Sequence, residues 1–96
     1  MYAAIVLINT DIGMVPQVAE ALAEMEPVQQ VYSVAGEYDI VVIIRVARFE
    51  EMSEVVSARI ARIPGVARTQ TLTAFRSYPA SLMEGMWRIG MEEEPA

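Results

Sequence analysis

Residues 31–46 read VYSVAGEYDIVVIIRV, and this stretch decides the fold because it joins a turn to an unbroken apolar run. The turn is Gly36-Glu37-Tyr38: glycine relaxes the steric limits on φ, and Asp39 favours turns because its side chain can bond nearby backbone. The flanking residues are therefore predicted to form a β-hairpin, with strands over 31–35 and 39–46. Ile40–Ile44 are all apolar, and successive side chains of a strand point to opposite faces. Both faces of this second strand must therefore be covered.

The other segments of the chain predict two helices and three strands. Residues 2–9, YAAIVLIN, form another apolar run without alternation and are predicted to be a strand buried on both faces. One helix is predicted from Val15 to about Met25 and another from Phe49 to about Ile63, each ended by a proline. The second helix carries an apolar stripe at α-helical spacing: Phe49, Met52, Val56, Ile60 and Ile63. Residues 28–35 and 66–78 are predicted to be more polar strands.

The order of these elements, β-α-β-β-α-β, is the ferredoxin-like arrangement of the α+β class. It predicts a four-stranded antiparallel sheet with two helices on one face. Right-handed crossovers place strands 2–9 and 39–46 at the centre of that sheet. This placement agrees with their apolar residues on both faces, whereas the two edge strands are more polar.

The second face of the sheet has no cover within this arrangement, and exposing so much apolar surface is unfavourable. One candidate cover is the extension 79–96, for which we predict a short helix with an acidic tail. The other is the sheet of an identical chain, packed face to face as a dimeric α+β barrel. We favour the dimer because the helical part of the extension is short and contains Gly85. Residues 1–78 are then the domain proper.

Composition narrows the function. The chain has no cysteine, no histidine and no lysine, and its net charge is −6. These absences remove disulfides, the commonest general base and transition-metal ligand, and Schiff-base chemistry, so we expect neither catalysis nor a cofactor nor a metal. The acidic charge and the scattered arginines argue against direct nucleic-acid binding. We also expect a cytoplasmic protein without membrane contact, since no apolar run reaches the ~18 residues of a span and the N-terminus lacks the basic region of a signal peptide.

Three motifs, in this order and spacing, resemble the effector-binding (RAM) domain of the Lrp/AsnC transcriptional regulators. They are Gly36-x-Tyr38-Asp39 before an apolar strand, Ile63-Pro64-Gly65-Val66, and Thr69-x-Thr71. The resemblance covers residues 2–78 and implies dimers with face-to-face sheets, which assemble into octamers or similar rings and bind amino acids between dimers. Full regulators also carry an N-terminal helix-turn-helix. Nothing of that kind precedes Met1 here, so the chain resembles a stand-alone member of the family.

The resemblance implies that the ligand contacts Gly36, Tyr38, Asp39, Thr69 and Thr71. Their chemistry suits a free amino acid: Asp39 can accept from an ammonium group, backbone near Gly36 can approach a carboxylate closely, and threonine hydroxyls both donate and accept. Each residue also has a purely structural interpretation, as a turn residue, an interface aromatic or a strand former.

Three functions remain open. The first is a homo-oligomeric amino-acid sensor that regulates transcription without its own DNA-binding domain. The second is an assembly partner that joins full-length Lrp/AsnC regulators through the same interface. The third is an enzyme resembling the small monooxygenases of the dimeric α+β barrel superfamily, in which some members use a histidine haem ligand that this chain lacks.

Overall fold

The structure, a computed structural model, describes residues 1–76 and 78, so the predicted extension 79–96 lies outside the described residues. Its elements follow the predicted β-α-β-β-α-β order, with the second helix divided into an α-helical and a π-helical part. They are β1 (Tyr2–Thr10), α1 (Val15–Ala23), β2 (Val28–Ser33), β3 (Ile40–Val46), α2 (Phe49–Ser53), the π-helix η1 (Glu54–Ile60) and β4 (Val66–Thr73).

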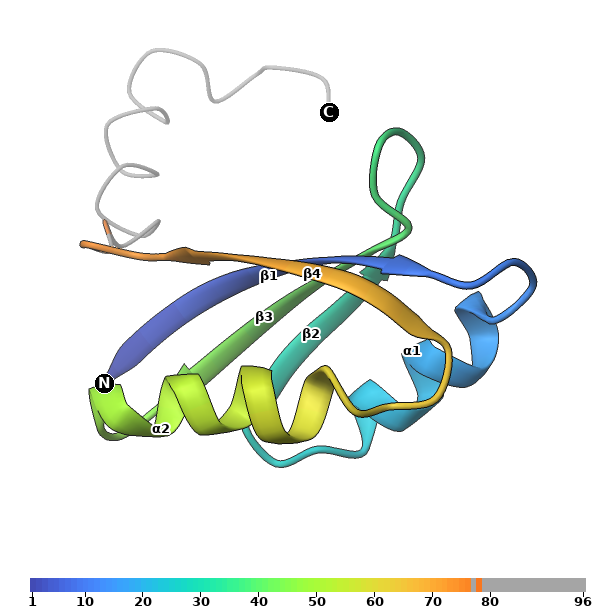
Figure 1. The fold of residues 1–96 in the computed structure, drawn as a ribbon. Helices are drawn as coiled ribbons and strands as arrows, with labels where there is room; N and C mark the ends of the chain where they lie inside the picture. Colours follow the sequence, from blue (N-terminus) through green and yellow to red (C-terminus); the bar gives the residue numbers. More distant parts are fainter. Residues whose placement is uncertain (77, 79–96) are drawn as a thin grey trace, which may run out of the picture.

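The four strands form one antiparallel sheet in the order β2-β3-β1-β4. The two apolar strands β1 and β3 are therefore central, as predicted, and the more polar β2 and β4 are the edges. Figure 1 shows α1 and α2 on the same side of this sheet. The ferredoxin-like α+β fold is thus confirmed, down to the placement of each strand.

The core lies between the sheet and the helices. Alternate residues of the central strands, such as Val6 and Val42, are 0% exposed and pack against Leu22 of α1 and Ile60 of η1. This core is closed within one chain. It accounts for only one of the two faces of the sheet.

The opposite face, which we call the open face, is also apolar. Ile5 pairs with Ile43 of β3 and with Leu72 of β4, so all three side chains point to the same side of the sheet. Leu72 is 45% exposed, and Tyr32 of β2, paired with Val41, is 48% exposed. No described helix or strand lies over this side of the sheet (Figure 1).

The second helix differs from the predicted α-helix because it contains a π-helical turn. Val55 is 4% exposed and Ile60 is 0% exposed, whereas Val56 is only partly buried. In an α-helix, residues five apart lie roughly 140° apart around the axis. The wider π turn lets both Val55 and Ile60 face the core, and its i→i+5 bond is present, from Ala61 N–H to the Val56 carbonyl at 2.9 Å.

The turn before β4 is packed tightly against α1. Gly65 has φ +101°, and a Cβ there would lie 2.9 Å from both Met14 Cε and Val18 Cγ2. Its carbonyl accepts a 2.8 Å bond from Asp11 N–H. Glycine is required at this position both by the backbone conformation and by the close approach.

Within the described residues, no helix has the length and apolarity needed to cross a membrane.

Candidate ligand-binding site

The loop between β2 and β3, residues 34–39, contains three of the five predicted ligand residues. It is longer than the predicted three-residue turn, and a bond from Val34 N–H to the Asp39 carbonyl, 2.9 Å, closes it. Gly36 has φ +124°, and a Cβ at that position would meet no atom within 4 Å. Space beside the Gly36 backbone is therefore available for a ligand, although the positive φ alone already favours glycine.

Asp39 has a structural role that the sequence did not predict. Its Oδ2 accepts a 2.8 Å bond from Thr10 N–H and a 3.4 Å bond from the Thr10 hydroxyl, and its own N–H donates to the Ile8 carbonyl at 2.9 Å. The carboxylate thus ties the start of β3 to the end of β1. An ammonium group at this site would share the carboxylate with Thr10.

Two further side-chain bonds hold the loop. The Asn9 amide donates to the Glu37 carbonyl at 2.8 Å, and the Tyr38 hydroxyl bonds the Gln70 side-chain oxygen. Together with Thr10, Asn9 and Gln70 are the residues that sequence reasoning missed. The polar pair Asn9-Thr10 at the end of an apolar strand was a usable signal, because an antiparallel pairing of strands 2–9 and 39–46 brings that end beside the loop.

The two predicted threonines, Thr69 and Thr71, lie on the opposite face of the sheet from Gln70, which bonds Tyr38. Thr69 pairs with Ile8 and Thr71 with Val6, so both threonines share the helix side of the sheet with these core residues. Gln70 lies between them in sequence and points to the open face. In a single chain, the five predicted residues therefore do not converge on one point.

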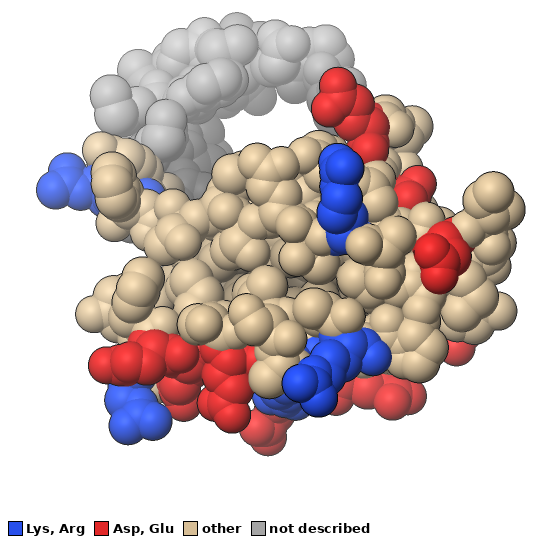
Figure 2. All heavy atoms as spheres, viewed as in Figure 1, with Lys and Arg blue, Asp and Glu red and all other residues tan. Residues whose placement is uncertain are grey.

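Thr71 instead lines a cavity of about 470 Å³ between β4 and the second helix. Most of its wall is apolar, and Thr73 bonds the Met52 sulfur across it at 3.8 Å. The remaining lining residues are Phe49, Glu50, Ser53, Val56 and Ser57. Figure 2 shows a largely uncharged band across this part of the surface, with charged groups gathered along the helix layer.

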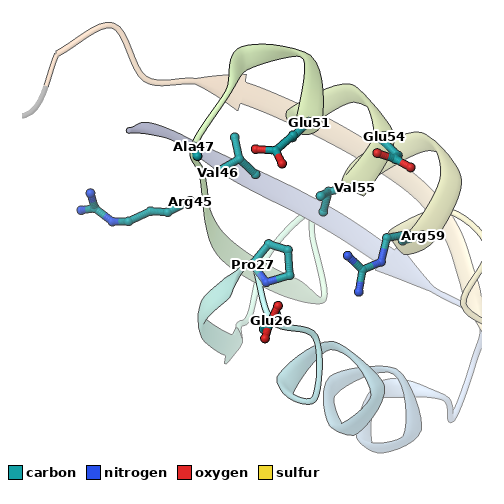
Figure 3. Close-up of a pocket in the computed structure, with 9 residues that line it drawn as sticks. All are labelled: Glu26, Pro27, Arg45, Val46, Ala47, Glu51, Glu54, Val55 and Arg59. Carbon is teal, nitrogen blue, oxygen red and sulfur yellow. The ribbon is translucent and has the colours of Figure 1, made fainter.

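A second cavity, of about 380 Å³, has a different character. It lies where the connection between α1 and β2 meets the end of β3 and the second helix, and charged groups surround an apolar floor (Figure 3). Its lining residues are Glu26, Pro27, Arg45, Val46, Ala47, Glu51, Glu54, Val55 and Arg59. In residues 1–76 and 78, no group of three or more carboxylates is arranged to hold a metal ion.

The domain is thus ferredoxin-like and of the α+β class, with an apolar open face and a polar loop held to β1 and β4 by hydrogen bonds. The model of the Lrp/AsnC ligand binding domain matches residues 3–82. The chain therefore belongs to the Lrp/AsnC family, as its motifs predicted.

Individual relatives agree with this assignment. The HTH-type transcriptional regulator FL11 of Pyrococcus abyssi is 35% identical over 75 residues, which are 78% of this chain and 49% of the regulator. The solved structure of TTHA0845 from Thermus thermophilus is 46% identical, with a TM-score of 0.78 over 82% of this chain and 99% of that one. The feast or famine regulatory protein Rv3291c of M. tuberculosis, solved in complex with L-methionine, is 28% identical, with a TM-score of 0.71 over 82% of this chain and 53% of that one.

These relatives fall into two sizes. The chain spans 39% to 49% of the length of the curated regulators that it matches. TTHA0845, in contrast, is covered almost entirely. The chain thus matches a solved chain of about its own size as well as regulators roughly one and a half times as long.

Proposed function

We propose that this chain is an oligomeric regulatory module that binds a free amino acid and performs no catalysis. Two findings support the proposal: its family is that of an effector-binding domain, and a relative at 28% identity was solved with L-methionine bound. The curated relatives are named as transcriptional regulators, not as enzymes.

The open face is the observation that carries the proposal. Ile5, Leu7 and Ile43 project from the two central strands into a side of the sheet that no described element covers. Burying apolar surface is the main favourable term in association. A second copy of the same chain, packed sheet to sheet about a two-fold axis, would present the same apolar patch and cover the face completely.

The ligand site of this module is assembled between such dimers, with the 34–39 loop and the β4 threonines contributed by different chains. The opposite orientations of Tyr38 and Thr71 support this arrangement. In the proposed dimer, the open face is buried against the second chain. Thr69 and Thr71 then remain on the outer, helix side of the sheet, where a neighbouring dimer can approach.

A second role, as an assembly partner of longer Lrp/AsnC regulators, is favoured by a specific observation. The curated relatives named as HTH-type regulators are roughly one and a half times as long as this chain, which matches 39% to 49% of their length. A shared open face would let this module pair with such a regulator and change its assembly. Co-purification of a tagged form of this chain with a longer paralogue would test this role.

The central experiment measures assembly and ligand binding on the same sample. We expect light scattering to give a multiple of 10.6 kDa, and calorimetric titration with the twenty amino acids to give binding for at least one. Ile43→Glu should shift the protein towards monomer, because it places a carboxylate on the open face that the proposed dimer buries. Gln17→Glu adds the same charge on exposed α1 and is the matched control.

A wild-type mass of 10.6 kDa at working concentration would contradict the dimer. Assembled protein that bound none of the twenty amino acids would contradict the sensing role and leave only the partner role.

A further inference from the structure

The charged cavity beside α1 includes none of the residues of the predicted ligand motifs. It is formed entirely within one chain, by the α1–β2 connection, the end of β3 and the second helix. Residues 34–39 and the β4 threonines are not among its lining residues. Whatever it binds, it is therefore separate from the site proposed above.

The cavity combines the three kinds of group that recognise a free α-amino acid. Arg59 supplies a guanidinium, whose planar donors match a carboxylate. Glu26 and Glu54 supply carboxylates that can accept from an ammonium group. Val46 and Val55, 6% and 4% exposed, form an apolar floor together with Pro27. A volume of about 380 Å³ lies within the usual range for small-molecule sites, roughly 300–1,000 Å³.

Figure 3 shows how these groups are arranged. Arg59 extends from the second helix towards the connection that carries Glu26 and Pro27, and Glu54 stands apart from it on the same helix. Arg45 extends away from the cavity, so we assign it no contact with the ligand. The side chain of Glu51 already has a structural role, since its Oε1 accepts a 2.9 Å bond from Arg48 N–H.

The π-helix is a second, independent observation that points to this site. Glu54 and Arg59 are the first and sixth residues of η1, so they are five residues apart. One turn of a π-helix brings residues at that spacing to the same side, whereas an α-helix would turn them roughly 140° apart. π-helical turns are rare in proteins, and those that occur are often found at functional sites. Here the turn places one acidic and one basic side chain over a shared apolar floor.

We propose that this cavity is a second site for a free α-amino acid, contained within one chain, in which Arg59 binds the carboxylate while Glu26 binds the ammonium. The inference rests on the proposal that amino acids are the effectors of this module. It adds a site that requires no neighbouring subunit. Amino acids with a small or medium apolar side chain fit the floor best, because Val46 and Val55 offer no hydrogen-bond partner to a polar side chain.

The first test uses L-methionine and two analogues, 3-(methylthio)propylamine without the carboxylate and 4-(methylthio)butanoate without the ammonium. Each analogue should bind at least about tenfold more weakly, since a hydrogen bond to a charged group contributes enough for that factor. Backbone amide shifts locate the ligand directly: methionine in the cavity should move the Ala47 and Val55 signals. Shifts confined to Gly36 and its neighbours would overturn the inference and leave the loop site standing.

The second test separates the two sites by substitution. Arg59→Gln should weaken methionine binding at the cavity at least about tenfold, while Arg62→Gln, two residues beyond η1 and outside the lining, should not. Asp39→Asn should affect only the loop site. A loss caused by Asp39→Asn alone would overturn the inference but not the proposed function. A loss caused by Arg59→Gln alone would support the inference and remove the loop site, and wild-type protein without any binding would overturn both.

Discussion

Asp39 is predicted to have two separable roles, one in stability and one in ligand binding. In Asp39→Ala, Thr10 N–H loses the carboxylate oxygen that it donates to at 2.8 Å in a partly buried position. A hydrogen bond to a charged group contributes about 1.5–3 kcal/mol, so the free energy of unfolding should fall by about 2 kcal/mol. Asp39→Asn keeps an oxygen acceptor and should lower it by about 1 kcal/mol or less. Both variants lose the charge that would pair with a ligand ammonium group.

Urea unfolding followed by circular dichroism measures the first role. All variants are compared at one protein concentration, because the proposed assembly would make the apparent stability depend on concentration. With a slope of roughly 1–3 kcal/mol per molar urea, Asp39→Ala should lower the midpoint by about 1 M. Glu37→Ala removes a carboxylate from the same loop but keeps the backbone carbonyl that Asn9 contacts, and is the matched control. An Asp39→Ala midpoint equal to that of Glu37→Ala would refute the structural role of the carboxylate.

Three further predictions concern the loop, the tight turn and the π-helix. Gly65→Ala should destabilise more than Gly36→Ala. Both substitutions impose strain of order 1–3 kcal/mol at positive φ, but only at Gly65 would the added Cβ lie 2.9 Å from the side chains of Met14 and Val18; urea midpoints compare the two variants. Tyr38→Phe removes an exposed hydrogen bond and should cost about 1 kcal/mol or less, with faster hydrogen exchange in the 34–39 loop as the sensitive measurement. Val55→Ala should lower the free energy of unfolding by about 1.5–2 kcal/mol, because buried methyl groups are removed. Val56→Ala should lower it clearly less, because Val55 is 4% exposed whereas Val56 is only partly buried. The reverse order would indicate that the segment is α-helical, with Val56 facing the core.

The fold could be predicted because its constraints are local in sequence. Apolar side chains on both faces of the predicted strands 2–9 and 39–46 require central positions in a sheet, and the crossover rule then fixes the edges. The structure has this order. Gly65 could be assigned to a turn from sequence, but its close approach to α1 could not, because that contact joins segments some fifty residues apart.

The π-helix could not be predicted because the sequence fits an α-helix almost equally well. Met52, Val56 and Ile60 follow the regular spacing of four, and Val55 stands beside Val56 with the same chemistry. Only the packing against the sheet selects Val55. The cavity that contains Arg59 depends on this choice, since it fixes the direction of every side chain in that turn. In the sequence, Glu54 and Arg59 look like ordinary charged residues on the solvent side of a helix.

The predicted ligand residues illustrate how alternation along a strand limits inference from motifs. The motif Thr69-x-Thr71 placed two hydroxyls on one face correctly, but it gave no information on which face. Pairing of Thr71 with Val6 assigns both hydroxyls to the helix side, while the bond to Gln70 holds Tyr38 at the open face. A ligand that touches both Tyr38 and Thr71 must therefore take them from different chains. The proposed loop site therefore depends on assembly, whereas the proposed Arg59 site does not. Diluting the protein until the proposed assembly dissociates should abolish binding at the loop site and preserve binding at the Arg59 cavity.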